Sequence, residues 1–111
     1  MTLVVQQGDQ YYIPFNLYQD KTELTDQNTT DVKIKLGGVS LKSSNGGLTY
    51  SEYEYGGKTS HAWMFPITET QTLSWGAGMV SYQAGVKIDD AIILSEVGLV
   101  EVNSSIFGEA W

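Results

Sequence analysis

Cysteine and arginine are both absent from this 111-residue chain. Without cysteine the protein has no disulfide, no thiolate nucleophile and no cysteine-ligated metal. Without arginine it lacks the side chain that holds phosphates and carboxylates through two parallel hydrogen bonds. Six lysines stand against thirteen acids, which gives a formal net charge of −7. Nucleic acids and anionic membranes are bound through clustered basic side chains, so this composition argues against both as partners.

Long apolar runs are missing as well. The longest apolar stretches fall far short of the roughly 20 residues that a membrane-spanning helix needs. The N-terminal residues contain no basic segment followed by an apolar one, so we expect no signal peptide and no transmembrane segment. Only two prolines accompany twelve glycines, a balance typical of a turn-rich β protein, and the length fits a single domain.

Alternation of apolar and polar residues predicts β-strands along most of the chain. Between Asp31 and Leu36, for example, Val32 and Ile34 share one face with Leu36 while lysines occupy the other face. The predicted strands number seven or eight and cover residues 3–5, 11–18, 31–36, 39–42, 48–55, 61–67, 80–88 and 91–102.

Short signals within and between these strands predict local geometry. Pro14 cannot donate a hydrogen bond to a neighbouring strand, so its strand is expected to lie at a sheet edge or to have a bulge there. The Asn45-Gly46 pair is a hairpin signal, whereas the polar residues 19–31 are typical of an ordinary loop. A change of alternation phase around Gly98 predicts a β-bulge in the last strand.

Residues 63–88, WMFPITETQTLSWGAGMVSYQAGVKI, predict a strand, one helical turn and a second strand that carry the chain from one sheet to another. Thr68 and Gln71 fit a capping box at the start of the helical turn, and Leu73 is expected to face the core. The strand after the turn has the longest alternation, so we place it centrally in its sheet. Tyr82 lies where sandwich folds often have a tyrosine whose hydroxyl bonds across the corner.

These features together predict an all-β fold, an immunoglobulin-like antiparallel β-sandwich of seven to eight strands with one short helical turn. Closure of a single sheet on itself is the alternative architecture. We expect residues 1–103 to form the β-sandwich domain and residues 104–111 to form an apolar C-terminal tail.

Few side chains in the sequence are candidates for catalysis or metal binding. His61 is the only histidine, and a catalytic triad would need a nucleophile such as Ser60 beside it in space, which no motif demands. Two groups of acids offer oxygen ligands for calcium: Asp89, Asp90 and Glu96, and the loop acids Asp20, Glu23, Asp26 and Asp31. Aspartate is also preferred in ordinary turns, and the spacing of a calcium-binding EF-hand loop is absent. We therefore expect a non-enzymatic protein with no catalytic, cofactor-binding or metal site.

Apolar side chains on exposed segments are the stronger candidates for function. Several tyrosines fall on strand faces that are outward or ambiguous, where they can stack on sugars, anchor a protein interface or pair across strands. The tail is too apolar to remain in water, so we expect it to fold back or to dock on a neighbouring subunit. The predicted interface residues are Ile106, Phe107, Trp111, Tyr12, Tyr18, Tyr53 and Tyr55.

Three stretches resemble small immunoglobulin-like structural domains of tailed phages and prophages of Gram-positive bacteria, such as the N-terminal domain of the upper baseplate protein. They are GDQYYIPFNLYQDKTELTD, WMFPITETQTLSWGAGMVSYQAGVKI and SEVGLVEVNSSI. The resemblance implies a virion structural module of a tail, baseplate or neck that forms homo-oligomers and contacts other virion proteins. It also implies a location in the virion, and in the host cytoplasm during assembly. A carbohydrate-binding module that uses exposed aromatics is the alternative function.

Overall fold

Strands dominate the computed structural model of the chain, which describes residues 3–95, 97–106 and 111. The all-β prediction is therefore confirmed. The one helix of this described part is α1 (Glu69–Ser74). The strands are β1 (Leu3–Gln6), β2 (Tyr11–Phe15), β3 (Tyr18–Gln19), β4 (Thr22–Glu23), β5 (Asp31–Leu36), β6 (Val39–Lys42), β7 (Thr49–Tyr55), β8 (Lys58–Ile67), β9 (Gly78–Ile88), β10 (Ala91–Leu94) and β11 (Gly98–Asn103).

The strand count exceeds the seven or eight predicted, for two reasons. Residues 19–31 are not a plain loop, because β3 and β4 form a small hairpin there. The predicted last strand is divided into β10 and β11.

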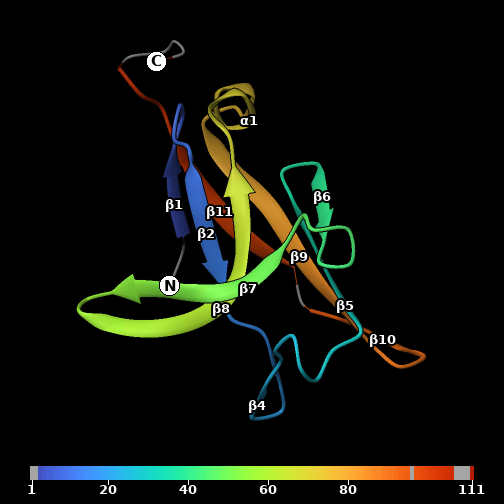
Figure 1. Cartoon of the computed structure of the whole chain (residues 1–111). Coiled ribbons are helices and arrows are strands. Elements are labelled where there is room, and N and C mark those ends of the chain that lie inside the picture. Colours follow the sequence, from blue (N-terminus) through green and yellow to red (C-terminus); the bar gives the residue numbers. More distant parts are fainter. Residues whose placement is uncertain (1–2, 96, 107–110) are drawn as a thin grey trace.

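The larger sheet is organised around β9. Its strand order is β1-β11-β9-β5-β6, and β10 also pairs with β9 (Figure 1). The central position predicted for this strand is confirmed. The neighbours of β9 run antiparallel to it, whereas β1 pairs with β11 in parallel.

The smaller sheet has the order β2-β8-β7, with both pairs antiparallel. Pro14 lies in β2, which pairs only with β8, so the predicted edge position is confirmed. Among the described residues the strands form separate sheets with free edges, not one sheet closed on itself.

One cluster of buried apolar side chains joins the inner faces of the two sheets. It includes the alternating residues predicted to point inward on β5 and β8, because every second side chain of a strand faces the same side. The cluster consists of Val5, Ile13, Phe15, Leu24, Val32, Ile34, Leu36, Leu48, Trp63, Phe65, Ile67, Trp75, Ala84, Val86, Val100 and Val102.

Helix α1 docks on the rest of the protein mainly through a polar side chain. The capping box is confirmed: the Gln71 N–H donates to Thr68 Oγ1 at 3.2 Å, and the Thr68 N–H donates to Gln71 Oε1 at 3.0 Å. Leu73, expected in the core, is only half-buried, and the fully buried position belongs to Thr72. The Thr72 hydroxyl donates to the backbone oxygen of Asp9 and accepts from the Gly8 N–H, both at 2.9 Å. Hydrogen bonding to the β1–β2 turn therefore decides which side of this short helix faces inward.

The predicted bulge lies between β10 and β11. Leu94 is opposite Gly85 and Gly98 is opposite Tyr82, so the chain advances four residues from β10 to β11 while β9 advances three. One extra residue exchanges the two faces of a strand, so outward-facing residues have even numbers before it and odd numbers after it. A Cβ atom at Gly98 would lie 2.3 Å from Tyr82 Cζ, which explains why the position has no side chain. The corner hydrogen bond predicted for Tyr82 is not observed with any described residue, because the ring instead lies over Gly98 and against Phe15.

The hairpin predicted at Asn45-Gly46 is wrong. The strands on either side, β6 and β7, belong to different sheets, so this turn carries the chain from one sheet to the other. A hairpin forms instead at Gly37-Gly38 between β5 and β6, where both glycines have positive φ angles of 57° and 86°. That geometry is a two-residue turn whose twist matches the flanking strands.

The distal half of the β7–β8 hairpin, residues 52–61, extends away from the other strands (Figure 1). We call this segment the arm. Glu52 and Glu54 are exposed, and so are the four residues Lys58–His61. The arm is a two-stranded ribbon outside the buried cluster, and such ribbons are marginally stable alone in water.

Candidate protein interface

The C-terminal tail presents two fully exposed apolar side chains. Ile106 and Trp111 are each as exposed as in an extended chain. The backbone N–H of Trp111 donates to Glu69 Oε2 at 2.6 Å, which links the chain terminus to α1. Phe107, the third predicted tail residue, lies outside the described residues. The side chains of Ile106 and Trp111 are thus exposed to solvent, and Trp111 lies at the end of the protein that holds α1.

The predicted tyrosines do not form one surface. Tyr12 and Tyr18 are strongly exposed, at 63% and 60%. Tyr53 is half-buried, and its hydroxyl donates to Asn16 Oδ1 at 3.3 Å. Tyr55 lies on β7, but its side chain is not among those described. Tyr12 is paired with Pro66 and Tyr53 with Ser60; six residues along β8 separate these partners by about 20 Å.

A larger group of exposed apolar side chains lies on the outer face of the six-stranded sheet. In the sequence, the change in apolar alternation between β10 and β11 indicated this group. Only the register of the two strands against β9 shows that both direct apolar side chains outward. We call this group the apolar stripe. It consists of Val4, Met79, Ile92, Leu94, Val97 and Leu99.

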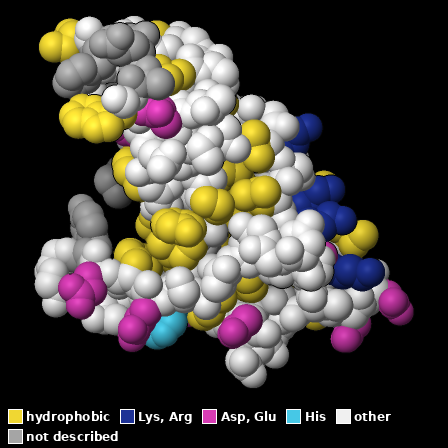
Figure 2. All heavy atoms as spheres, turned by 45° about the horizontal axis from the view of Figure 1, so that its top comes forward, with side chains coloured by type: hydrophobic (Ala, Val, Ile, Leu, Met, Phe, Trp, Pro, Cys, Tyr) yellow, Lys and Arg dark blue, Asp and Glu magenta, His cyan; other side chains and the backbone are white. Residues whose placement is uncertain are grey.

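Four of the six lysines lie on the same outer face as the apolar stripe. We call them the lysine band: Lys33, Lys35, Lys42 and Lys87. The sequence predicted only that the β5 lysines point outward; pairing of β5 with β6 and β9 brings the other two beside them. Figure 2 shows lysines gathered on one flank of the protein, and acids along another border.

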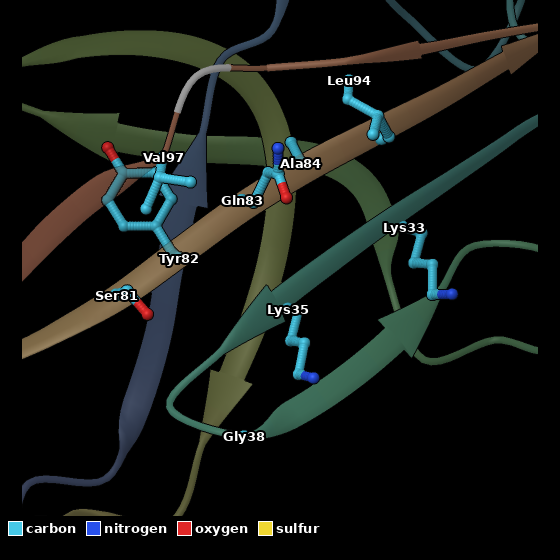
Figure 3. Close-up of a pocket in the computed structure, with 10 residues that line it drawn as sticks. Lys33, Lys35, Gly38, Ser81, Tyr82, Gln83, Ala84, Leu94 and Val97 are labelled. Carbon is cyan, nitrogen blue, oxygen red and sulfur yellow. The ribbon is translucent and has the colours of Figure 1, made fainter.

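A shallow hollow of about 360 Å³ lies between the lysine band and the apolar stripe. Lys33 and Lys35 line one side, and Leu94 and Val97 line the other (Figure 3). Gly85 lines the hollow, and a Cβ atom at this position would occupy part of it, 3.1 Å from Leu94 Cδ2. The hollow is open to solvent, and its walls combine positive charge with apolar surface.

Asp31 anchors the start of β5 at the border of this face. Its Oδ1 accepts from the Ser43 hydroxyl at 2.9 Å and from the Ser44 N–H at 3.0 Å, and its Oδ2 accepts from the Ser44 hydroxyl at 3.0 Å. Burial by itself would raise the pKa of Asp31, but these hydrogen bonds outweigh it and lower the pKa below its ordinary value. The carboxylate is therefore bound to serines of the β6–β7 crossing.

His61, considered as a catalytic residue, lies exposed on the arm. Its ring stacks on Tyr50, with centroids 5.8 Å apart and planes 18° from parallel. Burial raises the pKa of Tyr50, and the carboxylate of Glu23 raises it further. The described residues include no group of three or more His, Cys, Asp or Glu side chains placed to hold a metal ion. Glu96, named as a possible calcium ligand, lies outside them.

Comparison with protein-family models, with curated proteins and with solved structures finds no match. In the described part of the chain, no helix combines the length and apolar character needed to cross a lipid bilayer.

Proposed function

We propose that this chain is an immunoglobulin-like sandwich that serves as a non-enzymatic assembly module in the virion of a tailed phage or prophage. The strand order supports the immunoglobulin-like assignment. The order β2-β8-β7 corresponds to the B-E-D sheet of such domains, and β11-β9-β5-β6 corresponds to the G-F-C-C′ sheet. The helix α1 then occupies the corner between the E and F strands.

The apolar stripe is the observation that carries the assembly function. Its six side chains are between 45% and 71% exposed, although the same sheet buries a full set of apolar residues on its inner face. Contiguous apolar surface on a soluble protein usually marks a contact with another protein. The exposed Ile106, Trp111, Tyr12 and Tyr18 offer further contact area.

The virion context is supported by the resemblance of three stretches of the sequence to phage structural domains. The acidic composition fits partners that are proteins, both copies of this chain and other virion components, rather than nucleic acid or membrane. Location in the virion, and in the host cytoplasm during assembly, is part of the same proposal. Genes for tail or capsid proteins on either side of the coding sequence would support it; a neighbourhood of metabolic genes would contradict it.

Light scattering tests the assembly function. The intact chain is expected to have a mass above that of a monomer. Deleting residues 105–111 or introducing Ile92→Ser with Leu94→Ser should each lower that mass, because each removes exposed apolar contact surface. Circular dichroism serves as the folding control, since none of the described residues changed belongs to the buried cluster. A monomeric intact chain at every concentration tested would contradict self-assembly.

Carbohydrate binding is less well supported by the geometry. A sugar platform needs aromatic rings close together on one surface, whereas the partners of Tyr12 and Tyr53 on β8 are six residues apart. A glycan array distinguishes the two functions, because an assembly module should show no preference for any sugar.

A further inference from the structure

The lysine band is an unusual accumulation of like charge in an acidic protein. Lys33 and Lys42 are direct cross-strand partners, and Lys35 lies two residues along the same face. Like charges directly opposite each other destabilise a sheet. The thirteen acids of the chain outnumber the lysines about two to one, so this clustering is not a consequence of composition.

Among the residues that the structure describes, no lysine of the band forms an ion pair with an acid. Asp31 is the acid nearest in register, opposite Lys87, but its oxygens accept hydrogen bonds from Ser43 and Ser44. The band and the apolar stripe therefore form one open surface, and its charged part fits an acidic partner.

The arm carries two exposed acids, Glu52 and Glu54, and one exposed lysine, Lys58. Glu52 and Glu54 point to the same side of β7 because they are two residues apart. The exposed Asp26 lies beside Glu52, since both line a surface hollow of about 620 Å³. The arm belongs to the three-stranded sheet, whereas the lysine band lies on the outer face of the six-stranded sheet. Figure 2 shows the lysines on one flank of the protein and acids along the lower border, some of them next to the lysines.

We propose that the lysine band and apolar stripe of one copy bind the acidic arm of a second copy. Charge complementarity and the shortage of packing around the arm identify this occupant. The two surfaces differ, so the contact is heterologous and leaves a free arm and a free band on the pair. Such contacts close into rings or continue as filaments. This inference rests on the proposed self-assembly and names the surfaces that perform it.

Paired charge reversals test the contact. The first variant carries Lys33→Glu and Lys35→Glu, the second carries Glu52→Lys and Glu54→Lys, and the third carries all four changes. All four side chains are exposed, so folding is expected to persist and is checked by circular dichroism. The control, Lys21→Glu, reverses an exposed lysine that lies outside both the lysine band and the arm.

Sedimentation equilibrium should show self-association weakened at least tenfold in each two-residue variant. The four-residue variant should recover assembly because the two reversed lysine positions again face two reversed glutamate positions, and the two defective variants should assemble when mixed. The control should assemble like the unchanged chain, because Lys21 lies outside both surfaces.

The outcomes separate this inference from the proposed function. If the unchanged chain assembles and both two-residue variants assemble equally well, the arm-to-band contact is wrong while self-assembly stands. The contact is also wrong if the first variant dissociates but the four-residue variant does not recover, because the band then binds some other acidic surface. An unchanged chain that never associates contradicts both proposals.

Discussion

At the scale of single residues, Gly98 and Tyr82 determine how the last strand meets β9. The Tyr82 ring occupies the space that a side chain at Gly98 would need, with Cζ 2.3 Å from the position of a Cβ. We expect Gly98→Ala to destabilise the protein by about 1–3 kcal/mol through overpacking. Urea unfolding measures this loss. Gly76→Ala is the control, because a Cβ there meets nothing within 4 Å; equal effects of the two substitutions would contradict the steric argument.

Asp31 gives the protein a pH-dependent contribution to stability. Its folded-state pKa is lower than the ordinary value of 3.8, so folding favours the charged form. The stabilisation is present above pH 3.8 and is lost as the pH falls below 3.8 through the folded-state pKa. Asp31→Asn should therefore cost about 1 kcal/mol near neutral pH, with the difference from the unchanged chain shrinking in acid. Thermal unfolding across pH measures this. Asp90→Asn, in an exposed turn, is the control for the charge change; a difference for Asp31→Asn that persists at the lowest pH would count against the hydrogen-bonded carboxylate.

At the scale of elements, α1 depends on one buried hydroxyl. Thr72 connects the helix to the β1–β2 turn, and its replacement by valine leaves the Gly8 N–H without its acceptor. An unsatisfied buried group costs about 1–3 kcal/mol, so we expect Thr72→Val to lower the free energy of unfolding by that amount. Urea denaturation tests this, with the exposed Thr70→Val as the matched control. A loss no larger than the control's would show that apolar packing alone docks the helix.

The capping box and the arm differ in what stabilises them. The box closes between residues three apart in sequence, so local chemistry suffices to form it. The arm contains no residue of the buried cluster, and within residues 52–61 its two strands pair only with each other. Asn16 bonds to Tyr53 and to the backbone oxygen of His61, at the base of the arm. Elements with few buried contacts open most readily, and we infer that contact with a second copy supplies the missing support.

At the scale of the whole molecule, charge and apolar surface are distributed unevenly. The six-stranded sheet presents lysines and apolar side chains outward, while the three-stranded sheet ends in an acidic arm. Two different surfaces on different sheets favour a head-to-tail contact over a two-fold one. The proposed arm-to-band contact would let the chain repeat along a ring or filament, as the proposed role in a tail, baseplate or neck requires.

Much of the fold was predictable from the sequence because strand alternation and helix capping are local. The inward positions of β5, the edge location of Pro14 and the bulge near Gly98 all follow from residues within one strand. The predicted interface residues were only partly placed together, since the tyrosines lie on different strands and Tyr53 is engaged by Asn16. The apolar stripe was missed, because its outward direction depends on the register of β10 and β11 against β9.

The sequence by itself determined the all-β class, most strand positions and the capped corner, since each depends on side chains a few residues apart. The tertiary structure decided which strands share a sheet, so that Asn45-Gly46 became a crossing and β1 a parallel partner of β11. It also decided that lysines from β5, β6 and β9 form one band. Strand pairing is a long-range choice set by the burial of a common core, and a periodic pattern within one strand does not specify its neighbours.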